Sequence, residues 1–75
     1  MPTADELKTR IEAAIPETTA IVVDTTGTQD HFRAEVKSSA FIGKSRIQQH
    51  RMVYDVFGAE IGGAIHALSL KTEAS

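Results

Sequence analysis

Apolar residues recur at helical spacing in the first part of the chain. Four of them fall on one face of a helix: Leu7, Ile11, Ala14 and Ile15. Just before them, Thr3 and Glu6 have the spacing of a capping box, in which two side chains accept hydrogen bonds from backbone N–H groups. Pro16 disfavours helical backbone at the residue that precedes it. The pattern therefore predicts a helix from Thr3 to about residue 15.

Two segments with the pattern of β-strands follow. Residues 19–24, TAIVVD, are β-branched and apolar at neighbouring positions, which is typical of a strand covered on both faces. Residues 31–38, HFRAEVKS, alternate between apolar and polar positions, which is typical of a strand with one solvent-exposed face. The face that this alternation would bury carries Phe32, Ala34 and Val36. The polar stretch TTGTQD between the segments predicts a turn, so we expect an antiparallel hairpin.

A second helix is predicted near residues 45–57. Ser45 and Gln48 repeat the capping-box spacing at its start. The apolar residues expected on or beside its buried side are Ile47, Val53, Tyr54, Val56 and Phe57. Gly58 is expected to break the helix, and the following AEIG to form one further helical turn.

Residues 64–71, AIHALSLK, predict a third strand. The segment between this strand and residues 31–38 is long enough for a helical crossover, so the two strands can run parallel. The predicted order of elements is therefore α-β-β-α-α-β. This order indicates an α+β protein, a single domain over residues 1–75, with a three-stranded mixed sheet and helices packed on one face.

The composition narrows the chemistry that is open to the chain. The net charge is −2 and there is no cysteine, so the chain can form no disulfide and offer no thiolate to a metal. A negative net charge argues against a general nucleic-acid-binding protein. The first ten residues are polar and resemble neither a signal nor a transit peptide, and no apolar run is long enough to span a bilayer. We expect a cytoplasmic protein without membrane association.

A basic cluster is the first candidate site. It consists of Lys44, Arg46, His50 and Arg51. Positive residues at the start of a helix oppose its dipole, and backbone N–H groups there favour anions, so the cluster indicates an anionic partner. Arg33 and Lys37 are expected nearby. The alternative interpretation is a solvated charged surface, partly neutralised by Glu35 and Asp55.

Two enzymatic interpretations fail on the residues themselves. FIGKS ends like a phosphate-binding P-loop, but the motif requires glycine at position 38, which is Ser38 here. No serine lies in the sequence context of a nucleophile elbow, and no cysteine is available as a nucleophile. We therefore expect no enzymatic activity.

The histidines are the third group of candidates. His50 lies within the second predicted helix and is best interpreted as a structural or surface residue. His31 begins the second predicted strand on its polar face, beside the turn. His66 begins the third strand, in phase with Leu68 and Leu70. By position alone, His66 is either a half-buried histidine that bonds a backbone carbonyl or a metal ligand at the rim of the fold.

Residues 31–72, HFRAEVKSSAFIGKSRIQQHRMVYDVFGAEIGGAIHALSLKT, resemble the BolA family. The F-x-G-K-S, H-R-x-V-Y and I-H-A-L-S motifs carry this resemblance. It implies a fold like that of class II KH domains. It also implies a partner, a monothiol glutaredoxin with a CGFS motif, with which the family holds a [2Fe–2S] cluster together with glutathione.

The resemblance implies that His66 is a cluster ligand. Many members supply a second ligand, cysteine or histidine, from the loop between the first two strands, but TTGTQD contains neither. His31 is the nearest substitute. Because a [2Fe–2S] cluster needs four ligands, the isolated chain is expected to bind none, and the missing thiolates would come from the partner.

The family resemblance leaves a second function open. Some members are described as DNA-binding regulators, with links to transcription regulation and the stress response. KH domains grip nucleic acid with a G-x-x-G loop, whereas FGAEIGG has a different spacing and contains Glu60, which would repel phosphate. The basic cluster keeps DNA or RNA binding possible. Alone, the chain is expected to be a monomer or a weak homodimer.

Overall fold

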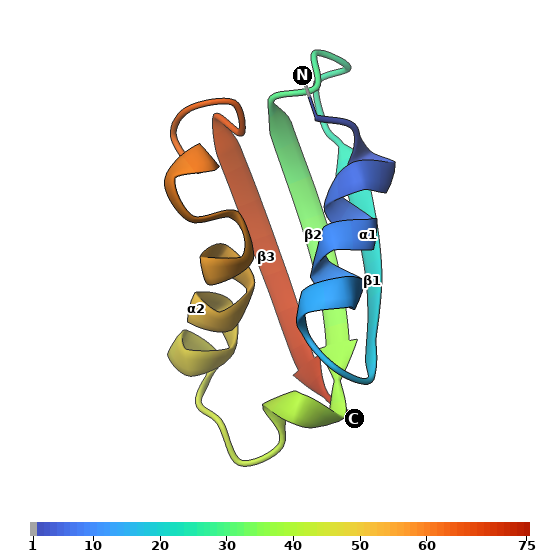
Figure 1. Ribbon diagram of the computed structural model, residues 1–75, viewed down its shortest axis with the longest axis vertical. Helices are drawn as coiled ribbons and strands as arrows, with labels where there is room; N and C mark the ends of the chain where they lie inside the picture. The colour runs from blue at the N-terminus through green and yellow to red at the C-terminus, as the bar shows by residue number, and fades with distance from the viewer. Residues whose placement is uncertain (1) are drawn as a thin grey trace.

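The computed structural model describes residues 2–75. Its elements, in chain order, are α1 (Ala4–Ala14), β1 (Thr18–Asp24), β2 (His31–Ser38), the 3-10 helix η1 (Ser39–Phe41), α2 (Arg46–Phe57), the 3-10 helix η2 (Gly58–Glu60) and β3 (Ala67–Ala74). The strands form one sheet in the order β1-β2-β3, in which β1 pairs antiparallel with β2 and β2 pairs parallel with β3 (Figure 1). The predicted α+β class, the hairpin and the mixed sheet are confirmed.

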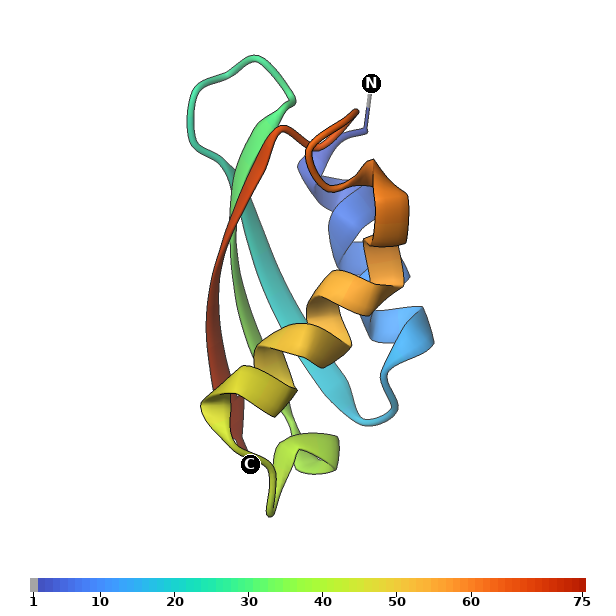
Figure 2. The ribbon, with the colours of Figure 1, turned by 90° about the vertical axis from the view of Figure 1, so that its left-hand side faces the viewer.

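Both helices pack on the same face of the sheet, as Figure 2 shows. The buried apolar residues lie between the two layers: Leu7, Ile11, Ile15, Ala20, Phe32, Ala34, Val36, Phe41, Val53, Phe57, Ile65 and Leu68. The predicted buried face of β2 is therefore confirmed. Within residues 2–75, neither helix has the length and apolar character needed to cross a membrane.

The helix boundaries follow the capping signals in the sequence. The Thr3 side chain accepts from the backbone N–H of Glu6 at 3.1 Å. The Ser45 and Gln48 side chains accept reciprocally from each other's backbone N–H groups at the start of α2. Both predicted helix starts are confirmed, and η2 supplies the further helical turn after Gly58.

Four apolar side chains are more exposed than the sequence predicts. Ile21 and Val23 of β1 are 58% and 42% exposed, because the helices cover only one face of the sheet. The prediction that β1 is covered on both faces is wrong. Ile47 is 70% exposed because it lies six residues before the buried Val53, about 120° around the helix. Ala14 of α1 is also exposed, outside the buried stripe of its helix.

The third strand begins at Ala67, later than the predicted residue 64. The N–H of Gly62 donates to the carbonyl of Ile65 at 2.8 Å, and the N–H of Ile65 donates to the carbonyl of Glu60 at 3.0 Å. These bonds close a turn, so residues 62–65 cannot join the sheet ladder. His66 consequently lies just before β3 instead of within it.

The side chain of Ser38 connects the end of β2 to η1 and to the segment that follows α1. Its side chain is completely buried, donates to the carbonyl of Pro16 at 2.9 Å and accepts from the N–H of Ala40 at 3.1 Å. We expect Ser38→Ala to lower the free energy of unfolding by about 1–3 kcal/mol, because both backbone groups lose their partner. Urea denaturation measures this loss. The exposed Ser69→Ala is the control, and equal stability of the two variants would contradict the assignment.

Candidate metal centre

His31 and His66 meet at one edge of the sheet. His31 is the first residue of β2 and pairs with Ala67, the first residue of β3. Because the two strands run parallel, they begin at the same edge, which is the upper end in Figure 1. The centroids of the two imidazole rings are 4.9 Å apart, and the ring planes are tilted by 52°. The topology thus brings together the two histidines that the sequence predicts as metal ligands.

Both rings are accessible to a partner. The His31 side chain is 38% exposed, and His66 is exposed. Within residues 2–75 the ring of His66 makes no hydrogen bond, and its backbone N–H donates to the carbonyl of Asp30 at 2.7 Å. The interpretation of His66 as a half-buried histidine bonded to a carbonyl therefore does not describe the structure.

Asp30 contacts both histidine segments. Its backbone carbonyl accepts from the N–H groups of His66, at 2.7 Å, and Ala67, at 3.1 Å. One carboxylate oxygen, Oδ1, lies 2.9 Å from Nδ1 of His31 and also accepts from the hydroxyl of Thr28. The hydrogen bond from Thr28, and then the one from His31, hold the pKa of Asp30 below its ordinary value. The carboxylate is therefore ionised at neutral pH. No motif in the sequence predicted a role for Asp30, whose available signal was its position next to His31.

The loop between β1 and β2 is folded around a second carboxylate. Asp24 accepts from the backbone N–H groups of Thr26, Gly27 and Gln29 at 3.3, 2.9 and 3.0 Å. Gly27 and Gln29 have positive φ angles of 77° and 61°. This is the turn predicted from TTGTQD. It places Thr28 and Asp30 beside the histidines without supplying a cysteine or histidine of its own.

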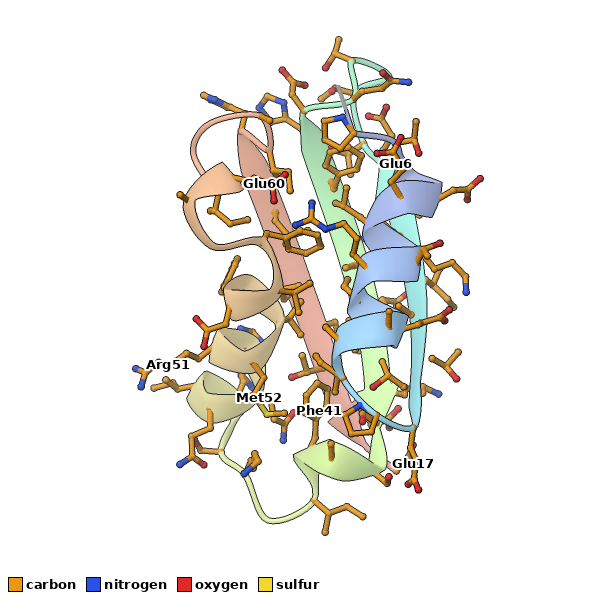
Figure 3. The ribbon with its side chains drawn as sticks, in the orientation of Figure 1. Glu6, Glu17, Phe41, Arg51, Met52 and Glu60 are labelled. Atoms are coloured by element: carbon orange, nitrogen blue, oxygen red, sulfur yellow. The ribbon has the colours of Figure 1, made fainter. Side chains whose placement is uncertain are left out.

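A salt bridge ties the segment before His66 to α1. Two nitrogens of Arg10 donate to the carboxylate of Glu60 at 2.9 and 2.5 Å, and the guanidinium lies 4.9 Å from the centre of the Phe57 ring. The hydrogen bond from Arg10 lowers the pKa of Glu60. The backbone carbonyl of Glu60 accepts from Gly63 and Ile65. Figure 3 shows Glu60 on η2, near the start of β3. The salt bridge therefore restrains the turn that delivers His66.

The chemistry of the donor set fits part of a metal centre. The site offers two imidazoles, and the chain contains no cysteine. Over residues 2–75, no group of three or more histidine, aspartate or glutamate residues is arranged to hold a metal ion. A [2Fe–2S] cluster requires four ligands and accepts two imidazoles on one iron. The pair fits one half of such a cluster.

The basic residues of α2, together with Lys44 just before the helix, divide into two groups. Lys44 and Arg51 border one shallow hollow together with Asp55, and Figure 3 shows Arg51 directed away from the sheet. Arg46 and His50 border another hollow beside β3. The four predicted residues therefore border two different hollows of the surface.

The remaining charges expected near this cluster lie elsewhere. Arg33, Glu35 and Lys37 alternate with the buried residues of β2, so they lie on the face of the sheet opposite the helices. Lys37 pairs with Glu73 at 3.3 Å. The expectations that Arg33 and Lys37 join the basic cluster, and that Glu35 neutralises it, are wrong.

Comparisons with known proteins identify relatives over most of the chain. A family model described as BolA-like protein matches residues 5–75. A protein of Rickettsia prowazekii is 30% identical over 69 residues, which cover 92% of this chain and 90% of that protein. By contrast, the matched segment spans about a third of the length of the human and mouse BolA-like protein 1 sequences.

Solved structures agree with the family model. A bolA protein homologue from Coxiella burnetii has a TM-score of 0.78 and 37% sequence identity, over 96% of this chain and 90% of that one. The BolA domain of SufE1 from Arabidopsis thaliana has a TM-score of 0.79 and 28% sequence identity, over 93% of this chain and 88% of that one. The resemblance predicted from residues 31–72 is confirmed, and this chain belongs to the BolA-like protein family.

Proposed function

We propose that this protein is a non-enzymatic adaptor that binds a monothiol CGFS glutaredoxin in the cytoplasm. In the complex it contributes His66, with His31 as the second ligand, to a [2Fe–2S] cluster that also contains glutathione. Its role would lie in the trafficking of iron–sulfur clusters and in iron and redox regulation. The observation that carries the proposal is the pair of accessible imidazoles 4.9 Å apart at one edge of the sheet.

The shortage of ligands supports a shared site. The chain supplies two imidazoles and no thiolate, so two of the four cluster ligands must come from outside it. A glutaredoxin cysteine and the thiolate of glutathione would supply them. This division explains why the isolated chain would bind no cluster and why partner binding and cluster binding would be coupled.

Each residue has a separate role in this proposal. His66 and His31 would hold one iron through ring nitrogens. Imidazole in place of thiolate raises the reduction potential of a [2Fe–2S] centre, as in Rieske proteins. The exposed cations Lys44, Arg46 and Arg51 would help to dock the partner through long-range attraction to its acidic groups.

Replacement of His66 tests the ligand assignment. Wild-type protein mixed with cluster-loaded glutaredoxin is expected to change the visible absorption and circular dichroism of the cluster, because imidazole replaces another ligand. His66→Ala is expected to abolish this change, and His31→Ala to reduce it. His50→Ala is the matched control, because His50 lies on α2 beside Arg46 and away from the pair. A change with His66→Ala that equals the wild-type change would contradict the assignment.

Nucleic-acid binding remains the second candidate function. Among residues 2–75, Lys44, Arg46 and Arg51 form no salt bridge, so their charges are available to phosphates. The carboxylate of Glu60, which would repel a backbone phosphate, is neutralised by Arg10.

The salt dependence of binding tests this second function. If Lys44, Arg46 and Arg51 contact phosphates, each alanine variant is expected to reduce the slope of log K against log salt by about one unit. Lys37→Ala is the control, because Lys37 lies on the opposite face of the sheet and pairs with Glu73. Fluorescence anisotropy with DNA and RNA pools measures the slope. Absence of binding at low salt would exclude this function.

A further inference from the structure

Asp30 is the residue that connects the two histidines, through two different parts of its structure. Its backbone carbonyl accepts from the N–H groups of His66 and Ala67 at 2.7 and 3.1 Å. Its carboxylate lies 2.9 Å from Nδ1 of His31. We propose that Asp30 is the positioning residue of the His31–His66 pair and that it presents Nε2 of His31 to the metal. This inference rests on the proposed function and specifies the ligand atom.

The carboxylate determines which nitrogen of His31 carries the proton. An ionised carboxylate is only an acceptor, so Nδ1 of His31 must be the donor in the 2.9 Å hydrogen bond. In the neutral ring the free electron pair is then on Nε2. Isolated histidine prefers the opposite tautomer, with the proton on Nε2. Asp30 therefore selects the tautomer that leaves Nε2 able to bind a metal.

This arrangement is the one that metal-binding histidines use in general. A histidine ligand commonly donates its second ring N–H to a carboxylate or carbonyl, which fixes the ring orientation and raises the basicity of the ligating nitrogen. His31 has such an acceptor in Asp30, whereas the ring of His66 forms no hydrogen bond within residues 2–75. The two imidazoles therefore differ, because only the ring of His31 is oriented by a hydrogen bond within residues 2–75.

The loop holds the Asp30 carboxylate in place. The hydroxyl of Thr28 donates to the same oxygen that faces His31, and it also lies 2.5 Å from the hydroxyl of Thr26. Asp24 accepts from the backbone N–H groups of this loop. A loop without cysteine or histidine thus contributes to the site indirectly, because it orients the carboxylate that orients His31.

Mutation can separate the contact made by the Asp30 side chain from the contacts made by its backbone carbonyl. Asp30→Ala removes the carboxylate but keeps the backbone carbonyl that binds His66 and Ala67. The amide protons of His66 and Ala67 are therefore expected to stay protected from hydrogen exchange in this variant, which shows that the edge of the sheet is intact. Asp30→Asn keeps an acceptor oxygen and serves as the conservative variant. Asp5→Asn is the control, because it removes an exposed carboxylate of α1 and leaves the loop between β1 and β2 unchanged.

The first arm of the test uses the protein without a cluster. Two-bond 1H–15N spectra at mildly alkaline pH, where imidazoles are neutral, report the tautomer of each histidine. We expect His31 to carry its proton on Nδ1 in wild type and in Asp5→Asn, and mainly on Nε2 in Asp30→Ala. Asp30→Asn is expected to restore the wild-type tautomer at least in part. An unchanged tautomer in Asp30→Ala would overturn the inference.

The second arm uses the complex with cluster-loaded glutaredoxin. We expect Asp30→Ala to weaken cluster retention against a chelator by about 10-fold or more, as is usual when a supporting hydrogen bond to a metal ligand is lost. Asp5→Asn should retain the cluster as wild type does. A normal cluster in Asp30→Ala, despite a changed tautomer, would overturn the positioning role and leave the proposed function intact. If wild-type protein itself leaves the cluster spectrum unchanged, the proposed function fails, and the tautomer spectra still decide whether Asp30 selects Nε2.

Discussion

The parallel pairing of β2 with β3 is the constraint on which the candidate site depends. It aligns His31 with Ala67, so that the ring of His31 comes within 4.9 Å of the ring of His66, the preceding residue. Parallel neighbours require a long crossover, and α2 supplies it while it buries Val53 and Phe57 in the core. The packing that stabilises the fold therefore also sets the distance between the two histidines.

Local signals in the sequence were sufficient to predict the order of the elements. Both helix starts follow from side-chain caps, and the alternation in β2 identifies its buried face, since each depends on neighbouring residues alone. The start of β3 was not predictable in this way. AIHALSLK resembles a continuous strand, but the N–H groups of Ile65 and His66 bond to the carbonyls of Glu60 and Asp30, and these partners are known only after the chain has folded.

In the candidate site, too, some features follow from the local sequence and others depend on contacts between distant segments. His66 was identified by the family resemblance, because its position alone also allowed a structural role. Its approach to His31 and the role of Asp30 depend on strand register, which no local pattern in this sequence determines. The exposure of Ile21 and Val23 likewise depends on which face of the sheet the helices cover.

We propose that this chain supplies nitrogen ligands to a cluster whose sulfur ligands belong to a partner. Pulsed electron paramagnetic resonance of the reduced complex tests it most directly, with 15N-histidine incorporated into this chain only and unlabelled glutaredoxin. We expect 15N hyperfine couplings typical of imidazole bound to iron, and their loss in His66→Ala. A reduced cluster without 15N couplings in the wild-type complex would exclude nitrogen ligation by this chain.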